Sequence, residues 1–289
     1  MHGIKSVGCF DLSYLVKIND NLNFHITKTI RIEMKQITQF NNRGGYESVV
    51  SLGYFCSVAS EIERMGLRTH SGPFDWQACV DFRKRIELID THFKEFFENL
   101  NEEGLYQKVS EPQIYFMKAV GVFLVHDFTM YKSLAEQLPE VRRKYERRVT
   151  SFYRQIVHKT LFIYYVNKDN DVDYINHNID YIRKTLRKFH PDNEIIFVAN
   201  TDKHLEVTPA YYVTPDPGDV VARKFLEKNE DLKSFLENLP FDQKQRHINM
   251  SFHKKKILKK KLCKPYRKMK ETLEKICKKP YIHTLRINI

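Results

Sequence analysis

The residue best placed to do chemistry in this sequence is Cys56, at the end of the segment 51–56. The apolar run 48–52 is typical of a buried strand and residues 57–65 have helical character, so Cys56 falls at a strand-to-helix turn. A thiol beside a helix N-terminus meets the positive end of the helix dipole, which favours the nucleophilic thiolate. Free backbone N–H groups there can also hold an oxyanion. The alternative is a cysteine that only fills space beneath the helix.

A nucleophilic thiol needs a proton acceptor, and His126 is the candidate base. It follows the apolar run 121–125, so we expect it at the end of a strand. Asp127 or Asp75 would orient its ring. Because neighbouring residues on a strand point to opposite faces, an Asp127 contact requires the strand to have ended, which leaves Asp75 as the alternative. A histidine hydrogen-bonded at the sheet edge is the other interpretation of His126.

The candidate substrate-binding residues near the thiol lie in two segments. Gly53 belongs to the turn itself, whereas Ser71 and Trp76 belong to the loop 69–76, which also carries Asp75. This loop brings hydroxyl, carboxylate and indole groups together. The alternative is a turn whose aromatic side chains fill the core while Asp75 caps the next helix.

Two arginines extend the candidate site. Residues 133–157 have the pattern of an arginine-rich helix, and Arg147 and Arg148 on it could clamp a phosphate or carboxylate. Surface or intradomain salt bridging is the alternative for such a cluster. The histidines and cysteines show no metal-ligand spacing. We therefore expect no metal and no resident cofactor, with acyl-CoA as a co-substrate if the reaction is acyl transfer.

The elements that must position these residues alternate along the chain. The runs 160–166 and 194–199 are typical of buried strands, and an amphipathic helix over 174–189 connects them. Residues 114–117 are β-prone, and 211–213 suit an edge strand. This order predicts an α/β fold with a largely parallel sheet flanked by helices, in a Rossmann-like three-layer arrangement, followed by a helical basic C-terminal extension.

The charge distribution suggests how the chain is divided. The formal charge of +12 arises almost entirely from residues 254–279, which hold 13 Lys or Arg and two Glu. We predict an N-terminal extension over 1–45, an α/β domain over 46–240 and a helical Lys-rich tail over 241–289. The tail could bind an anionic surface, or be a solvated helix. The nearly neutral body gives no reason to expect a specific nucleic-acid partner.

The cysteine count and hydropathy indicate the compartment. Five cysteines without CxxC pairs fit free thiols in a reducing environment. No apolar stretch reaches the roughly 18–20 residues that span a bilayer, and the first residues lack the apolar run of a secretory signal. The sequence predicts a cytoplasmic protein without a transmembrane segment.

Several spaced motifs resemble a bacterial family catalogued as putative papain-like cysteine peptidases, a domain of unknown function often met near genes for surface polysaccharides. The matching residues are Ser51, Leu52, Gly53, Cys56, Ala59, Gly66, Leu67, Arg68, Ser71, Pro73, Phe74, Asp75, Trp76, His126, Asp127, the run 144–148 and the run 161–163. The resemblance covers roughly 49–200 and implies Cys56 as nucleophile and His126 as base. It implies no substrate.

Three functions follow as hypotheses. The first is a thiol-dependent hydrolase or peptidase that uses Cys56 and His126. The second is an acyltransferase that passes an acyl group from CoA or another thioester to a sugar in surface-polysaccharide biosynthesis, which phosphate-gripping arginines would favour. The third is a non-catalytic module that binds a glycan or nucleotide. The substrate is accordingly a small molecule, a glycan or a peptide.

Overall fold

The structure is a computed structural model, and it describes residues 45–78, 80–207, 209–213 and 224–277. The expected N-terminal extension therefore lies outside the described residues except for Gly45. Within them, Tyr46 forms an isolated parallel bridge with Phe241, and its N–H donates to the carbonyl of Pro240 at 2.6 Å. The start of the α/β body thus contacts the segment where the expected C-terminal tail begins.

The sheet that carries the candidate thiol is parallel and has four strands. Its order is β1-β6-β7-β8, with β1 at Ser48–Ser51, β6 at Thr160–Val166, β7 at Glu194–Ala199 and β8 at Ala210–Tyr212. Each neighbouring pair runs parallel. The sequence prediction of a parallel α/β sheet is confirmed, and β6 and β7 begin and end at the predicted residues.

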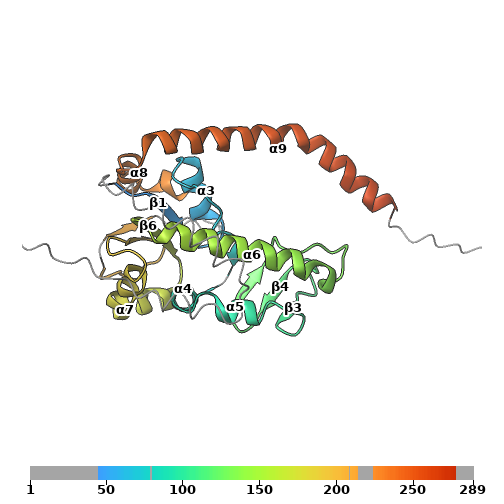
Figure 1. The fold of residues 1–289 in the computed structure, drawn as a ribbon, viewed down its shortest axis with the longest axis horizontal. Helices are drawn as coiled ribbons and strands as arrows, with labels where there is room; N and C mark the ends of the chain where they lie inside the picture. Colours follow the sequence, from blue (N-terminus) through green and yellow to red (C-terminus); the bar gives the residue numbers. More distant parts are fainter. Residues whose placement is uncertain (1–44, 79, 208, 214–223, 278–289) are drawn as a thin grey trace, which may run out of the picture.

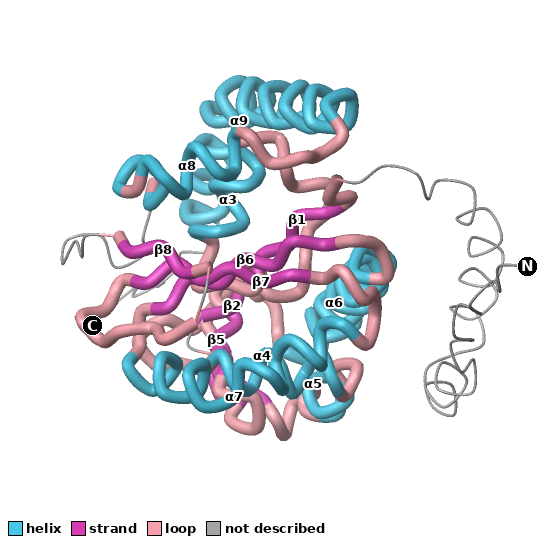
Figure 2. The backbone as a smooth tube through the Cα atoms, turned by 90° about the vertical axis from the view of Figure 1, so that its left-hand side faces the viewer, coloured by secondary structure: helices cyan, strands magenta, loops and turns pink. Residues whose placement is uncertain are grey.

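Helices cover both faces of this sheet (Figures 1 and 2). One face carries α3 (Ser57–Arg64), η2 (Phe225–Lys228), α8 (Glu230–Glu237) and α9 (Gln243–Cys277), and the other carries α4 (Phe82–Asp90), α5 (Lys94–Glu98), α6 (Leu134–Ile156) and α7 (Asp169–Arg187). A strand covered on both faces must direct alternate side chains into two cores. Strand β6 does so, because Leu161 and Ile163 join one core cluster while Phe162 and Tyr164 join the other.

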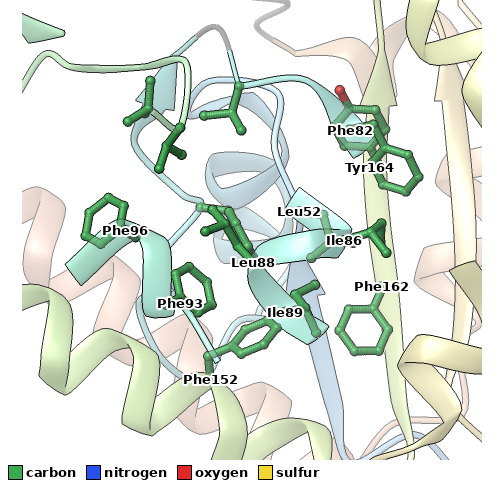
Figure 3. Close-up of a cluster of buried hydrophobic side chains, with 14 of the residues drawn as sticks. Leu52, Phe82, Ile86, Leu88, Ile89, Phe93, Phe96, Phe152, Phe162 and Tyr164 are labelled. Carbon is green, nitrogen blue, oxygen red and sulfur yellow. The ribbon is translucent and has the colours of Figure 1, made fainter. Parts of the chain in front are cut away.

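The larger core cluster packs α4 against the sheet (Figure 3). Phe82, Ile86 and Ile89 are fully buried at spacings of four and three, so they form one apolar stripe facing Phe162 and its neighbours. Burial of each such side chain stabilises the fold by about 1.5–3 kcal/mol. This stripe fixes the position of α4 behind the end of β1.

A second, antiparallel sheet corrects the expectation of a single, largely parallel sheet. Its order is β2-β5-β4-β3, with β2 at Gln77–Ala78, β5 at Val122–Leu124, β4 at Tyr115–Met117 and β3 at Leu105–Gln107. All three pairings are antiparallel. The predicted β-prone runs 114–117 and 121–125 contain β4 and β5, whereas β2 and β3, with two and three residues, are too short to show an alternating pattern, so the pairing into a second sheet was not predicted.

Helix α9 starts on the body and then extends beyond it (Figure 1). Arg246 Nε donates to the carbonyl of Met65 at 3.0 Å, and Asn249 Nδ2 donates to the carbonyl of Gly66 at 2.9 Å. These bonds satisfy carbonyl groups at the end of α3. Among the described helices, none is both long and apolar enough to cross a membrane.

Candidate functional site at the thiol turn and the His126 pocket

The turn that carries Cys56, residues 51–56, is called the thiol turn, and hydrogen bonds fix it to the central strand β6. The N–H of Leu52 donates to the carbonyl of Ile163 at 2.9 Å, and the N–H of Tyr165 donates to the carbonyl of Gly53 at 3.0 Å. Leu52 and Gly53 are therefore both hydrogen-bonded to β6, at positions two residues apart. The place where the chain leaves β1 is set by the sheet.

Cys56 is the N-cap residue of α3, so the thiol lies at the strand-to-helix turn. Its side chain makes no capping hydrogen bond, and the first turn of α3 has no acidic residue. The carbonyl of Cys56 accepts the N–H of Ser60 at 2.9 Å, which begins the helix. The thiol is free and half-buried. This places the thiol beside a helix N-terminus whose first turn carries no carboxylate.

A buried arginine that sequence reasoning missed lies directly behind this turn. The Arg85 side chain is fully buried, and a Cβ at Gly53 would lie 2.9 Å from its Cζ. Gly53 also has φ +102°, which L side chains rarely adopt. The rings of Phe74 and Tyr164 have centroids 5.5 and 5.8 Å from Cζ. Gly53 is thus required sterically, whatever its role toward a substrate.

The charge of Arg85 has no direct hydrogen-bonded counterpart. All three of its guanidinium nitrogens are buried without a hydrogen-bond partner among the described residues. The Tyr164 hydroxyl instead donates to Asp171 Oδ2 at 2.6 Å. Burial lowers the pKa of Arg85, while Tyr164 and Asp171 act in the opposite direction. A buried cation without a hydrogen-bond partner lowers the free energy of unfolding.

His126 lies just beyond β5, and strand β2 brings Trp76 to it. Gln77 pairs with Leu124 in an antiparallel register, so the residues before β2 and after β5 meet at one end of the sheet. The ring centroids of Trp76 and His126 are 5.8 Å apart, with the planes at 85°. Trp76 is half-buried and His126 is exposed. The imidazole is therefore positioned by the indole and remains open to solvent.

An open pocket of about 210 Å³ lies at these rings and is lined by Trp76, His126, Asp127 and Arg148. The Arg148 Cζ is 5.4 Å from the ring centroid of Tyr145, and its Nη1 is buried without a hydrogen-bond partner in the described part of the chain. An unused guanidinium donor beside an imidazole suits a carboxylate, phosphate or carbonyl oxygen. No group of three or more His, Cys, Asp or Glu within the described residues could hold a metal ion.

The Asp127 carboxylate contacts α6 rather than the His126 ring. It is 1% exposed, accepts the Tyr145 hydroxyl at 3.1 Å and forms an ion pair with Lys144. Burial and the charge of Asp127 raise the pKa of Tyr145 well above its usual value. Between Asp127 and His126, both described, no hydrogen bond is formed. The role of Asp127 as the orienting residue stays a prediction.

The Asp75 carboxylate holds the loop 69–76 in place. It is buried, pairs with Arg68 and accepts the N–H of Gly72 at 2.7 Å. Burial raises the pKa of Asp75, and the Arg68 charge opposes this. Ser71 in this loop is exposed. These contacts give Asp75 a structural use, and its orienting role toward His126 also stays a prediction.

Thiol and imidazole are linked through the core rather than by direct contact. No hydrogen bond joins the Cys56 sulfur to the His126 ring, although both residues are described. Arg85 contacts Gly53 of the thiol turn on one side and Phe74 of the loop that carries Trp76 on another. The turn and the loop are therefore packed around one side chain, and a Cys56–His126 pair stays a prediction.

The two candidate arginines line different pockets. Arg148 belongs to the pocket at His126, whereas Arg147 lines a larger pocket together with His70 and Arg154. The side chains of neighbouring helical residues point about 100° apart, which accounts for the separation. The two arginines therefore do not share one bound group within either pocket.

Comparison with known proteins gives one match. A family model described as "Putative papain-like cysteine peptidase" matches residues 47–203, more than half of the chain. The chain has no match among curated proteins and none among solved structures. The matched residues include the thiol turn, the loop 69–76, His126 and α6.

Proposed function

Because the chain belongs to the family described as "Putative papain-like cysteine peptidase", we propose that it is a thiol-dependent hydrolase with Cys56 as nucleophile. The observation that carries the proposal is the half-buried free thiol at the N-cap of α3, beyond the carboxyl end of a parallel strand. Functional groups of open α/β sheets gather at that edge. The helix N-terminus favours the thiolate and offers N–H donors to an oxyanion.

In the proposed reaction, His126 removes the thiol proton and the Cys56 sulfur attacks the carbonyl carbon of an amide. A C–S bond forms, and the N–H groups at the start of α3 stabilise the oxyanion. As the C–N bond breaks, His126 returns the proton to the leaving amine. Water then cleaves the thioester, with His126 as base, which releases the acid and restores the thiol. The step requires His126 to approach Cys56 when substrate binds, as often happens on going from a free enzyme to its complex.

Acyl transfer is the second candidate, and Arg148 favours it. Arg148 lines the pocket at His126 and has a buried Nη1 without a hydrogen-bond partner among the described residues, so its guanidinium could donate to a phosphate oxygen of a CoA-like thioester. The same acyl-enzyme would form at Cys56, and a sugar hydroxyl would replace water in the second step. Exclusion of water from the pocket would decide between the two outcomes.

The decisive experiment compares alkylation rates of individual thiols in the native protein. Iodoacetamide is added across pH 5–9, and peptides are quantified by mass spectrometry. The exposed free Cys263 is the internal reference. We expect Cys56 to react at least about tenfold faster than Cys263 at neutral pH, because the helix N-terminus favours its thiolate. His126→Ala should remove most of this excess.

The matched control is His177→Ala, which removes an exposed histidine of α7 far from both segments in the sequence. This variant should leave the Cys56 rate unchanged. An acyl thioester added to the wild type should give an acylated Cys56 peptide, and release of the acid or transfer to an added sugar then distinguishes hydrolysis from transfer. A Cys56 that reacts no faster than Cys263 at every pH would sink the nucleophile role and leave a non-catalytic binding module.

A further inference from the structure

A second pocket, of about 780 Å³, is lined by residues of α6 and of the first turns of α9. Small-molecule sites typically enclose about 300–1,000 Å³. Its wall includes Glu47 and Ser48 at the amino end of β1. Cys56 follows the carboxyl end of the same strand, so this pocket lies at the other end of the sheet. It is not part of the thiol site, and the proposed hydrolase does not use it.

One wall is a single face of α6 with a regular chemical pattern. Arg147, Thr150, Ser151 and Arg154 all line the pocket, at helical spacings of three, four and seven. A separation of seven residues along a helix is about 10 Å. The wall therefore carries arginines at two backbone positions about 10 Å apart, with a threonine and a serine between them. Arg147 is exposed and makes no ion pair within the described residues.

The other walls add polar groups and one aromatic ring. His70 comes from the loop after α3, Asn249 and Phe252 come from α9, and His158 follows α6. The Phe252 side chain is 66% exposed, so its ring is available for contact. Glu47 is the one carboxylate among the lining residues, and it pairs with His158 at 3.3 Å. The pocket is therefore electropositive and rich in hydrogen-bonding groups.

The lowered pKa of His70 is consistent with an electropositive pocket. Burial lowers the pKa of His70, and the charges of Arg154 and Arg68 lower it further. A positive environment that disfavours protonation of an imidazole favours an anion. The hydroxyl groups of Thr150 and Ser151, which lie between the two arginines on α6, match the hydroxyls of a polyol, and an aromatic ring can pack against the C–H face of a sugar.

We propose that this pocket binds a sugar or polyol carrying two phosphate groups about 10 Å apart, one held by Arg147 and the other by Arg154. Each arginine donates two N–H groups to one phosphate. The hydroxyls of Thr150 and Ser151 then face the polyol frame between the phosphates. A single phosphate would occupy only one end of the site, and a neutral sugar would occupy neither.

The test measures binding to the full chain by calorimetry with matched probes. The probes are fructose 1,6-bisphosphate, glucitol 1,6-bisphosphate and inositol 1,4-bisphosphate, with inorganic phosphate and fructose as the single-anion and neutral references. We expect at least one bisphosphate to bind about tenfold or more tightly than phosphate, and fructose not to bind. Arg147→Gln and Arg154→Gln should each weaken that binding by about tenfold or more, because each removes a charge-assisted pair.

The control variant is Arg143→Gln, one helical turn before Arg147 and outside both pockets. It should keep the wild-type affinity, as should Cys56→Ala, which separates this site from the proposed hydrolase. Thermal melting confirms that each variant is folded. The proposal is overturned if no bisphosphate binds at about 1 mM, if phosphate binds as tightly as the bisphosphates, or if Arg143→Gln weakens binding as much as Arg147→Gln. Tighter binding of an RNA duplex, lost in the same variants, would also overturn it.

Discussion

The two ends of the parallel sheet are built on different principles. At the carboxyl end, the thiol turn has no spare space, because Gly53 lies against the buried guanidinium of Arg85. At the amino end, the chain leaves a pocket of about 780 Å³ lined by exposed and half-buried polar side chains of α6 and α9. One region is determined by close packing around a buried charge. The other is a solvent-open pocket lined mainly by polar side chains.

Substitutions at the two ends of the sheet should therefore affect different properties. Tightly packed interiors transmit even small changes in volume, so changes around the thiol turn should alter the stability of the whole domain. Substitutions of exposed polar residues usually change stability little, so changes in the pocket between α6 and α9 should alter ligand binding alone. Substitutions at the two ends of the sheet test this difference.

The largest effect is expected for Gly53→Ala. The new Cβ would need a φ of +102° and would lie 2.9 Å from the Arg85 Cζ. The conformation costs about 1–2 kcal/mol and the overpacking about 1–3 kcal/mol, so we expect the free energy of unfolding to fall by about 3 kcal/mol. Urea unfolding can be followed by the fluorescence of Trp76, the single tryptophan of the chain.

The matched control is Gly121→Ala. Gly121 has φ +70°, but a Cβ there would meet nothing within 4 Å. Only the conformational cost of about 1–2 kcal/mol applies. Equal losses in the two variants would show that Arg85 does not constrain the turn, and the contrast between the two ends would lose its basis.

An intermediate effect is expected for Arg85→Met. Methionine fills a similar volume without a buried charge, so the free energy of unfolding should stay unchanged or rise by about 1–4 kcal/mol. Alkylation of Cys56 should nevertheless slow by roughly threefold to tenfold, because a positive charge behind the turn is lost in a region of low dielectric. Arg83→Met is the control, since Arg83 is 70% exposed on the same helix. A clear loss of stability in Arg85→Met would show that the guanidinium has a partner that stabilises it.

The smallest effect is expected from titration of His70. Burial, and then Arg154 and Arg68, lower its pKa in the folded state. The unfolded chain therefore binds the proton more readily, so stability should fall as the pH drops through the unfolded value near 6.5. Because the side chain is only partly shielded from solvent, the loss should be only a few tenths of a kcal/mol. Urea unfolding at pH 7.5 and 5.5 should show a smaller loss in His70→Gln than in wild type, and an equal loss would contradict this assignment.

The sequence predicts the two central strands of the parallel sheet well because they are seven and six residues long and almost entirely buried. β6 and β7 match their predicted ranges, and a continuous apolar run is what such strands require. Helix α7 begins at Asp169, earlier than the predicted 174, since its first turn is rich in polar residues that hide the periodicity. In the antiparallel sheet, the predicted runs 114–117 and 121–125 contain β4 and β5, and the two-residue strand β2 was missed because it is too short to show a pattern.

Parts of the candidate site were predictable and parts were not. The strand-to-helix turn at Cys56 follows from local pattern alone. Arg85 had a signal that was overlooked, because it lies on the same stripe as the buried Phe82 and Ile89, where a charged residue is unexpected. The pocket between α6 and α9 had none, since segments far apart in the sequence meet there only through the tertiary fold.

Helix α6 is a wall of both pockets, with Arg148 in one and Arg147 in the other. It also holds the carboxylate next to His126 through Lys144 and Tyr145. A small rotation of this helix about its axis would change both cavities together. If a ligand at one cavity prefers one rotational state, thermodynamic linkage requires that occupancy of the other cavity alter its affinity by the same factor. In that case the shared helix would make the affinity of one pocket depend on a ligand in the other.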